Sequence, residues 1–395
     1  MLSSYFPYGI LELPFWGYAL VVFGLIQLMF LGITLYLHRE QSHGGLVLHP
    51  LLRHFFRFWL WFSSGTVTRE WVAVHRRHHA FADQPGDPHS PVVFGLKKVV
   101  LEGYELYIAA ARDPEILKHY GRGTPDDWLE RKLYGRWPAA GIILFIAAEL
   151  VLFGVPGIVM AAIHMAAQPF FAAGIINGVG HRLGYRSFEM ASTATNIVPW
   201  GLLVGGEELH NNHHAFPRSA CFAVQPWEID IGWLWIRLFR ALRLAEVRRV
   251  APHPHLIRAR STLDADTVRA LFINRMHVLR DYARRVVKPV CRELARREPE
   301  GAVPRIASML LIRHPALLAD EARRMLSDLL ARYEVLRAVV EFREGLQHAW
   351  NLAAANQTSA VQQLREWCVR AEASGIRSLR EFALRLRDYS ATAPV

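Results

Sequence analysis

Two long apolar segments dominate the first 180 residues. Residues 15–37 contain only Gln27, Thr34 and tyrosines as polar side chains, so as a helix they are long enough to cross a hydrocarbon layer of ~30 Å. Residues 138–176 carry one formal charge, Glu149, and are interrupted by the turn-forming residues 154–157. This pattern predicts a hairpin of two helical crossings whose legs need tilt or local thinning of the bilayer. The chain is therefore predicted to cross the membrane three times.

Residues 46–68 are also apolar, but Arg53, His54 and Arg57 interrupt them. Charged side chains are costly at the centre of a bilayer. We therefore expect this segment to lie in the membrane interface, or to dip into it, rather than to cross.

The distribution of Lys and Arg predicts the orientation. Neither residue type occurs before Arg39 or between Arg136 and Arg182, whereas basic residues crowd the other connections. Because basic residues favour the cytoplasmic side, we expect the N-terminus and the hairpin tip outside, and residues 39–137 and 182–395 in the cytoplasm.

The remaining segments predict helices and turns on the cytoplasmic side. Residues 81–136 form a polar connection with a helical pattern at 97–113, and residues 195–206 are apolar but too short to span. Helical periodicity in the tail covers 263–297, 318–350 and 359–389, with breaks at 299–304, Pro315 and 373–375. The fold class is therefore all-α: integral membrane helices and interfacial helices under a histidine-rich cytoplasmic cap (1–245), followed by a soluble helical extension (246–395).

Composition and charge agree with this division. The chain is 52% apolar with a mean hydropathy of +0.12, which excludes a disordered chain. The net charge of +11 lies almost entirely in residues 241–395, which hold 27 basic and 17 acidic side chains. Three scattered cysteines are too few for a disulfide scaffold or a paired-cysteine zinc site, and they indicate a reducing compartment.

Three short windows hold eight of the nineteen histidines within 16 residues: 38–43 (HREQSH), 75–79 (HRRHH) and 210–214 (HNNHH). Neutral imidazole is a strong ligand for iron, copper, nickel and zinc. Each window alone is equally consistent with a solvated turn, but the three together predict a metal site on the cytoplasmic face.

The spacing adds to this prediction. On a helix, His75, His78 and His79 lie on one face, and so do His210, His213 and His214. His38 and His43 are five residues apart, about 140° around an α-helix, and would suit two different metals or a frayed helix end.

A further pair, Asn177 and His181, lies where the hairpin returns to the cytoplasm. We interpret His164 and the other scattered histidines as packing or surface residues. The number of candidate ligands exceeds the four of a zinc centre. A carboxylate-bridged di-iron site, which requires two ExxH pairs and two further glutamates on a four-helix bundle, is disfavoured.

These boxes, with the flanks REWVAVHRRHH, DPHSP and GGEELHNNHHAFP, resemble the membrane-bound fatty acid desaturases of the acyl-CoA delta-9 type over residues 15–245. The chain is most similar to the bacterial branch that acts on acyl chains esterified in phospholipid. The resemblance implies two iron ions (Fe2+/Fe3+), dioxygen as co-substrate and a cis double bond, usually at carbon 9. It also implies four membrane helices in the bacterial inner membrane, the first of which we expect to be missing or reduced to residues 1–14.

By the same resemblance, nine histidines bind the irons and Asn177 holds a metal-bound water. The nine are His38, His43, His75, His78, His79, His181, His210, His213 and His214. From proximity in sequence, we expect Glu207, Asp83 and Asp87 to orient the imidazoles.

Electrons must come from a separate protein, because no haem, iron–sulfur or dinucleotide motif occurs in the chain. We expect ferredoxin, rubredoxin or a similar carrier with its reductase. Arg39, Arg76 and Arg77 are candidates to contact an acidic carrier or lipid headgroups.

Four functions stay open at this point: a phospholipid acyl desaturase, an acyl-CoA desaturase, a hydroxylase with the same boxes, and a nucleic-acid-binding membrane protein whose histidines store or sense metal. Residues 365–390 of the tail resemble the C-terminal helices of some insertion-element transposases. Nucleic acid is disfavoured as a partner, since no base-reading module is evident. The basic tail fits an anionic membrane surface better.

Overall fold

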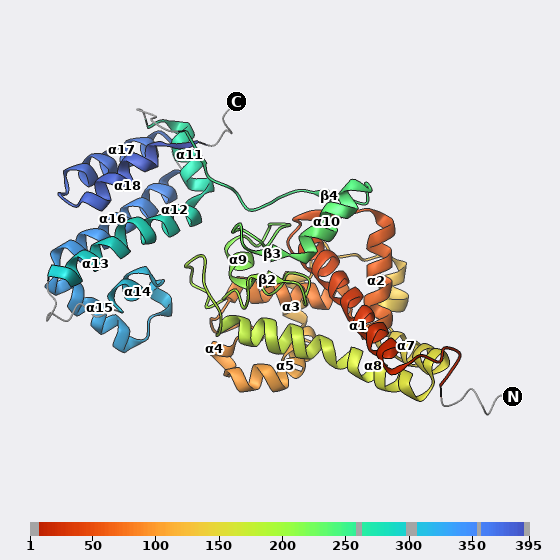
Figure 1. Ribbon diagram of the computed structural model, residues 1–395. Coiled ribbons are helices and arrows are strands. Elements are labelled where there is room, and N and C mark those ends of the chain that lie inside the picture. The colour runs from red at the N-terminus through yellow and green to blue at the C-terminus, as the bar shows by residue number, and fades with distance from the viewer. Residues whose placement is uncertain (1–7, 258–262, 298–305, 354–356, 391–395) are drawn as a thin grey trace. The chain divides into compact units, whose positions relative to one another are not determined.

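The computed structural model describes residues 8–257, 263–297, 306–353 and 357–390, most of which are helical (Figure 1). The prediction of a mostly helical chain is confirmed, since the strands have only two or three residues. Backbone contacts divide the chain into two compact units: unit 1 contains residues 1–186 and 192–251, and unit 2 contains residues 187–191 and 252–395. The division after Ala251 lies close to the predicted boundary at 245.

Unit 1 contains two helices that are long and apolar enough to cross a membrane. They are Phe15–Ser42, with 28 residues, and Val155–His181, with 27 residues. A shorter apolar helix, Pro138–Phe153, precedes the second. These helices match the predicted segments 15–37 and 138–176, and the number of crossings stays a prediction. The elements of unit 1 are, in chain order, α1 (Phe15–Gly32), η2 (Ile33–Ser42), β1 (Leu46–Leu48), α2 (Pro50–Ser64), α3 (Thr68–Phe81), α4 (Pro91–Phe94), α5 (Leu96–Ala111), α6 (Pro114–Tyr120), η3 (Glu130–Tyr134), α7 (Pro138–Phe153), α8 (Val155–Gln168), η4 (Pro169–Gly178), η5 (Val179–His181), β2 (Trp200–Gly201), α9 (His210–Ala215), β3 (Ile229–Asp230), α10 (Ile231–Ala241) and β4 (Ala245–Val247).

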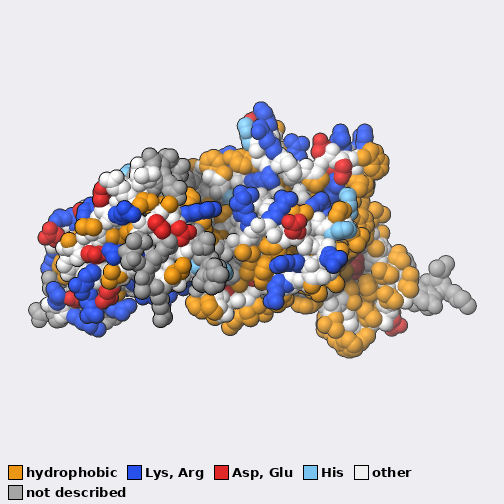
Figure 2. Space-filling model, turned by 90° about the horizontal axis from the view of Figure 1, so that it is seen from above, with side chains coloured by type: hydrophobic (Ala, Val, Ile, Leu, Met, Phe, Trp, Pro, Cys, Tyr) orange, Lys and Arg blue, Asp and Glu red, His pale blue; other side chains and the backbone are white. Residues whose placement is uncertain are grey.

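Large apolar side chains cover the outward faces of these helices. Leu20 on α1, Ile143 on α7 and Ile163 on α8 are 61%, 65% and 49% exposed. On the face drawn in Figure 2, hydrophobic side chains gather around the helices next to the N-terminus. An apolar surface of this kind is suited to lipid rather than to water.

The hairpin helices α7 and α8 approach each other closely at a glycine. A Cβ atom added to Gly157 would lie 2.0 Å from the carbonyl oxygen of Glu149 on α7. The chain turns between the helices at Gly154, whose φ of 65° favours glycine. Small residues at such contacts allow helix backbones to pack closely in a membrane.

The charged side chains of α2 are paired within the protein. Arg57 is 3% exposed and donates hydrogen bonds to Asp127 and Glu130. Arg53 donates to Glu40. The pairing explains how these arginines are accommodated in an otherwise apolar helix, and the interfacial position of α2 stays a prediction.

The interior of unit 1 is built around the junction of α1 and η2. Met29, Leu35, Tyr36 and Leu37 are fully buried there. The antiparallel pair β1–β4 joins three residues of each strand, including Leu46 to Val247, and the parallel pair β2–β3 joins only two. These contacts hold the end of η2 against the polar segments that follow the hairpin.

Unit 2 has its own hydrophobic core, which includes Tyr282, Trp367 and Phe382, each about 1% exposed. The predicted tail helices are confirmed, with additional short elements, and the predicted break at 299–304 lies outside the described residues. The elements are β5 (His255–Leu256), α11 (Ala265–Ile273), α12 (Arg275–Tyr282), η6 (Ala283–Val287), α13 (Lys288–Arg297), α14 (Ala307–Ile312), η7 (Pro315–Leu317), α15 (Asp320–Arg332), α16 (Glu334–Ala353), α17 (Gln357–Ala373), α18 (Arg377–Arg387) and β6 (Tyr389–Ser390).

The close approach at Gly157 predicts a specific sensitivity. Gly157→Ala should destabilise the protein by about 1–3 kcal/mol, because the added methyl group collides with backbone that cannot move aside. Gly24→Ala on α1 is the matched control, since an added Cβ meets nothing within 4 Å there. The measurement is thermal unfolding in detergent. Equal melting temperatures for the two variants would contradict the packing described here.

Candidate metal centre

The structure brings the nine predicted histidine ligands together in two groups. The groups are His38, His43, His75, His79 and His213, here called the five-histidine group, and His78, His181, His210 and His214, the four-histidine group. Within each group, one candidate ligand atom of every residue lies within 4.8 Å of the others. The residues come from η2, α3, η5 and α9 and from the position directly after η2. The centre therefore joins both apolar helices to α3, which lies between them in the chain, and to α9, which follows them.

Of the two alternatives left open for His38 and His43, two different metals or a frayed helix end, the structure favours the second: both belong to the five-histidine group, and His43 lies at the end of η2. The reason is the π-helical geometry of η2, in which the amide of His43 donates to the carbonyl of His38 over 3.2 Å. A helix with i→i+5 hydrogen bonds brings residues five apart to the same side, whereas an α-helix separates them by about 140°.

Each histidine triplet also divides between the groups. On α3, His75 and His79 belong to the five-histidine group and His78 to the four-histidine group. On α9, His210 and His214 belong to the four-histidine group and His213 to the five-histidine group. Residues four apart share a group, and the intervening residue faces the other one. Each of these helices therefore contributes to both groups.

The three predicted orienting carboxylates contact the imidazoles. The Nδ1 atoms of His38, His78 and His181 donate to Glu207 (2.8 Å), Asp87 (3.0 Å) and Asp83 (2.9 Å), respectively. Such contacts set the tautomer of the ring and leave Nε2 with a free lone pair.

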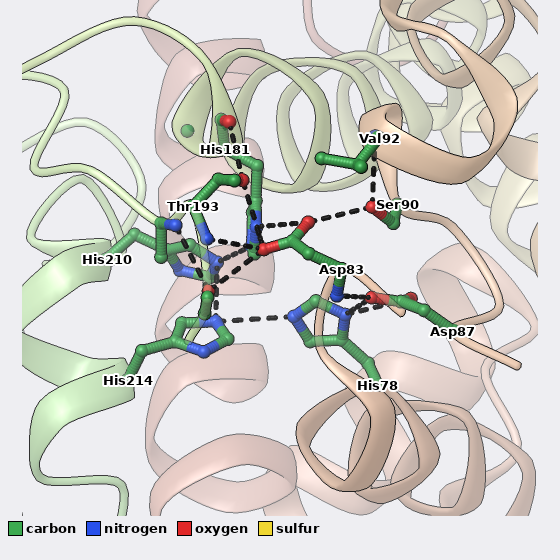
Figure 3. Close-up of polar contacts among 12 residues, drawn as sticks. His78, Asp83, Asp87, Ser90, Val92, His181, Thr193, His210 and His214 are labelled. Carbon is green, nitrogen blue, oxygen red and sulfur yellow. Dashed lines mark hydrogen bonds and ion pairs between the residues drawn. The ribbon is translucent and has the colours of Figure 1, made fainter. Parts of the chain in front are cut away.

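Asp83 also accepts hydrogen bonds from Ser90 (2.7 Å) and from the backbone amide of Thr193 (2.6 Å) (Figure 3). Burial acts to raise the pKa of Asp83, but His181, the Ser90 hydroxyl and the Thr193 amide together outweigh it and hold that pKa well below its usual range. Asp83 is therefore ionised, and it fixes His181 in place.

Shared protons alone cannot satisfy the four-histidine group. Its Nε2 atoms form a chain with neighbouring distances of 3.0 Å (His181–His210), 3.1 Å (His210–His214) and 3.2 Å (His214–His78). The two end rings offer only lone pairs at Nε2, because their Nδ1 atoms donate to carboxylates. If both middle rings donate to the end rings, neither of their Nε2 atoms has a lone pair left for the contact between them. Any other arrangement leaves another contact without a proton.

A cation resolves this conflict, because every Nε2 lone pair then points at it. A metal bound at roughly 2.0–2.1 Å places neighbouring ligand nitrogens at right angles about 3 Å apart, which agrees with the distances between the rings. Burial, with neighbouring imidazoles, lowers the pKa values of His75, His79, His210, His213 and His214 well below the usual one, so these rings are neutral ligands. The donor set therefore fits two transition-metal ions.

A cavity of about 620 Å³ opens beside both groups. His38 and His75 of the five-histidine group and His210 of the four-histidine group line it, together with Asn177. Much of the remaining wall is apolar and includes Trp71, Val74, Ile142, Met165, Ala166 and Ile176. Asn177 thus lies on the cavity wall with His210, and its role towards a metal-bound water stays a prediction.

His89 was not predicted as a site residue, although it lies in the DPHSP segment that carries part of the family resemblance. His89 is 5% exposed, stacks on His78 with ring centroids 4.6 Å apart and lines the cavity. Together with His78 and Asp87 it forms a third set of neighbouring metal-ligating side chains. In the sequence, the position of His89 two residues after Asp87 was the feature that could have indicated it as a candidate ligand.

The suggestion that Arg39 contacts an electron carrier is wrong. Arg39 is 1% exposed and donates two hydrogen bonds to Asp230, each 2.9 Å long. Arg76 and Arg77 are half-buried and donate to backbone carbonyls, including those of Gln41 and Gly86. These arginines hold the segments around the histidines together.

Comparison with known proteins identifies the family. The fold and the site define a histidine-rich protein built on apolar helices. The family model described as fatty acid desaturase matches residues 13–233, which is more than half of the chain. The chain therefore belongs to the fatty acid desaturase family, which is membrane-associated and generally di-iron. The family resemblance seen in the sequence, and with it the expected oxygen-dependent desaturase class, is confirmed.

Individual relatives from plants and bacteria agree with this assignment. The chain is 32% identical over 222 residues to the icosanoyl-CoA 5-desaturase of Limnanthes douglasii; the match covers 54% of this chain and 60% of that protein. It is 30% identical to the sn-1 stearoyl-lipid 9-desaturase of Synechocystis sp., covering 56% and 68%. It is 28% identical to the delta-9 acyl-lipid desaturase 2 of Arabidopsis thaliana, covering 58% and 74%.

The tail matches a different family model. The model described as transposase covers residues 269–392, all within unit 2. This match includes the segment 365–390 whose resemblance to transposase helices is visible in the sequence.

The carboxylate contacts predict how the five-histidine group responds to substitution. Glu207→Leu should weaken metal binding at this group roughly 10–100-fold, because His38 loses the acceptor that orients its ring. Metal affinity is measured by competition with a chelator. Glu115→Leu, at a side chain that is 66% exposed, is the control. Unchanged affinity in Glu207→Leu would show that Glu207 does not orient the ligand.

Proposed function

We propose that the protein is a fatty acyl desaturase that introduces a cis double bond, at carbon 9, into saturated acyl chains esterified in phospholipid. The observation that carries the proposal is the position of two all-imidazole groups on the wall of a largely apolar cavity. The reaction removes two hydrogens from the acyl chain. These two hydrogens, together with two electrons and two protons, reduce one dioxygen to two waters. Two irons bound by the nine histidines would supply the redox chemistry that side chains lack.

The residues of this chain have three tasks in the proposed reaction. The histidines hold the metals, and Glu207, Asp83 and Asp87 keep His38, His181 and His78 in the tautomer that presents Nε2. The apolar cavity wall excludes water and orients a methylene chain beside the histidines.

The substrate proposal depends on the relatives and on the cavity. The relatives include enzymes named for acyl-CoA and for acyl-lipid substrates, so both carriers are compatible with the family. A cavity that opens between apolar helices favours an acyl chain delivered from the bilayer. Acyl-CoA is therefore the alternative carrier that the experiment below includes.

We propose three crossings of a bacterial inner membrane, with the histidines and the C-terminus in the cytoplasm and the N-terminus outside. Two apolar helices of sufficient length, the shorter apolar α7 and the distribution of Lys and Arg support this topology. An external ferredoxin, rubredoxin or similar carrier with its reductase would supply the electrons. Unit 2 is proposed to be a basic extension that the chemistry does not require, and nucleic acid is not among the proposed partners.

Metal content and lipid composition test the proposal. The purified protein should hold about two irons per chain, and its expression in a host that lacks desaturase activity should raise the 16:1 and 18:1 fractions. His213→Ala should lose metal and activity, whereas His119→Ala, at a side chain that is 55% exposed, should behave as the unsubstituted protein. Labelled phospholipid and labelled acyl-CoA, each given with reductant and dioxygen, then identify the carrier. Absence of iron together with unchanged lipids would rule out the desaturase.

The cavity predicts a second effect on activity. Ala166→Phe places a large ring on the cavity wall and should reduce desaturation of long acyl chains at least tenfold without loss of iron. Ile163→Phe, at an exposed position of the same helix, is the control that keeps activity. The activity of each variant is measured with saturated chains of different length. Full activity of Ala166→Phe with every chain would show that the acyl group lies elsewhere.

A further inference from the structure

Helix α9 carries three of the nine histidines, yet little in its own sequence stabilises it. It has six residues, His210–Ala215, and no side chain caps its N-terminus. Isolated helices of this length are not stable in water. The direction in which its histidines point must therefore be fixed by contacts with the rest of unit 1.

These contacts converge on Asn212, which lies between two of the ligands and is 1% exposed. The backbone amide of Asn212 donates to the side-chain oxygen of Asn196 (3.1 Å), and the side-chain amide of Asn196 donates back to the oxygen of Asn212 (3.0 Å). The side-chain amide of Asn212 donates to the carbonyl of Phe222 (2.9 Å) and to Glu228 (2.7 Å).

Glu228 is the acceptor at the centre of this network and is 7% exposed. Besides Asn212 and Asn196, three groups donate to it, namely the Tyr185 hydroxyl (2.8 Å) and the backbone amides of Val224 and Gln225 (2.8 Å each). Among the ion pairs of the described residues, none joins Glu228 to a lysine or arginine, so hydrogen-bond donors alone compensate its burial.

We infer that Asn212 and Glu228 are positioning residues that orient α9, so that His210 and His214 face the four-histidine group while His213 faces the five-histidine group. The inference rests on the proposed metal-binding function. The inference gives a structural role to Asn212, the second asparagine of the HNNHH box, and to Glu228, which lies fourteen residues after the last residue of the box.

The two groups depend on α9 to different extents. The helix supplies two of the four ligands of one group and one of the five ligands of the other. A change in its direction should therefore release the metal of the four-histidine group first. A general loss of folding, by contrast, would release both metals together.

Glu228→Leu tests this difference. The leucine leaves the buried donors of Asn212, Val224 and Gln225 without an acceptor, and the affinity of the four-histidine group should fall roughly 10–100-fold. The full-length protein, purified in detergent, should then retain about one iron per chain instead of two. Cobalt(II) substitution gives an optical spectrum for each group that does not depend on activity.

Glu228→Gln is the conservative variant that should rescue the metal content. Its amide oxygen still accepts from Asn212 and the two backbone amides, and its N–H group donates to the Tyr185 hydroxyl. Glu246→Gln, at an exposed position of β4, is the control for loss of a carboxylate. If Glu228→Leu does not fold, Asn212→Ala removes the same link from the side of α9 and should show the same preferential loss.

The outcomes separate the inference from the proposed function. One metal retained by Glu228→Leu or Asn212→Ala, with two in Glu228→Gln, supports the inference. Two metals retained in Glu228→Leu and Asn212→Ala, or equal loss in Glu228→Leu and Glu228→Gln, overturns it. An unsubstituted protein without any metal contradicts the proposed function itself.

Discussion

The structure depends on one electrostatic constraint: nine closely packed imidazoles meet through their Nε2 atoms, and lone pairs at about 3 Å repel unless positive charge lies between them. Neighbouring Nε2 atoms are 2.8 Å apart at His79–His213 and 2.9 Å apart at His38–His213 and His43–His75. Protonating the rings would supply charge, but burial lowers the pKa values of six of them well below the usual one, namely His43, His75, His79, His210, His213 and His214. Bound metal satisfies both conditions, so the helices, carboxylates and buried arginines around the site are best understood as parts that hold the rings in this arrangement.

Much of the site was predictable because its chemistry is concentrated in short stretches. Histidine density identified the boxes, and the count of Lys and Arg predicts, independently of any histidine, that they share one membrane face. Glu207, Asp83 and Asp87 were found because each lies within a few residues of a box. Helical content and the apolar helices were predictable for a similar reason, since hydrophobic periodicity is a local property.

What could not be predicted depends on contacts between distant segments or on local hydrogen-bond registers. Glu228 contacts Tyr185, 43 residues away in sequence, and no pattern near either residue indicates the pair. The sequence around Arg39 is typical of a surface residue in a polar segment. In the structure Arg39 is buried and donates hydrogen bonds to Asp230 and to two backbone carbonyls. The division of each histidine triplet between the groups requires the direction of α3 and α9, which periodicity alone does not supply.

The π-helices show how an apolar helix becomes part of a metal site. Both candidate spans begin as α-helices and change to i→i+5 hydrogen bonding as they approach the histidines, at η2 and at η4. Because each hydrogen bond of a π-helix spans one residue more than in an α-helix, the side chains that follow are rotated relative to an α-helical path. At η2 it aligns His38 with His43, and at η4 it precedes His181 and carries Asn177. An uninterrupted α-helix would place His38 and His43 about 140° apart and would leave the five-histidine group without one of its ligands. The π-helical turns are thus a consequence of the need to bring each ring to its own group.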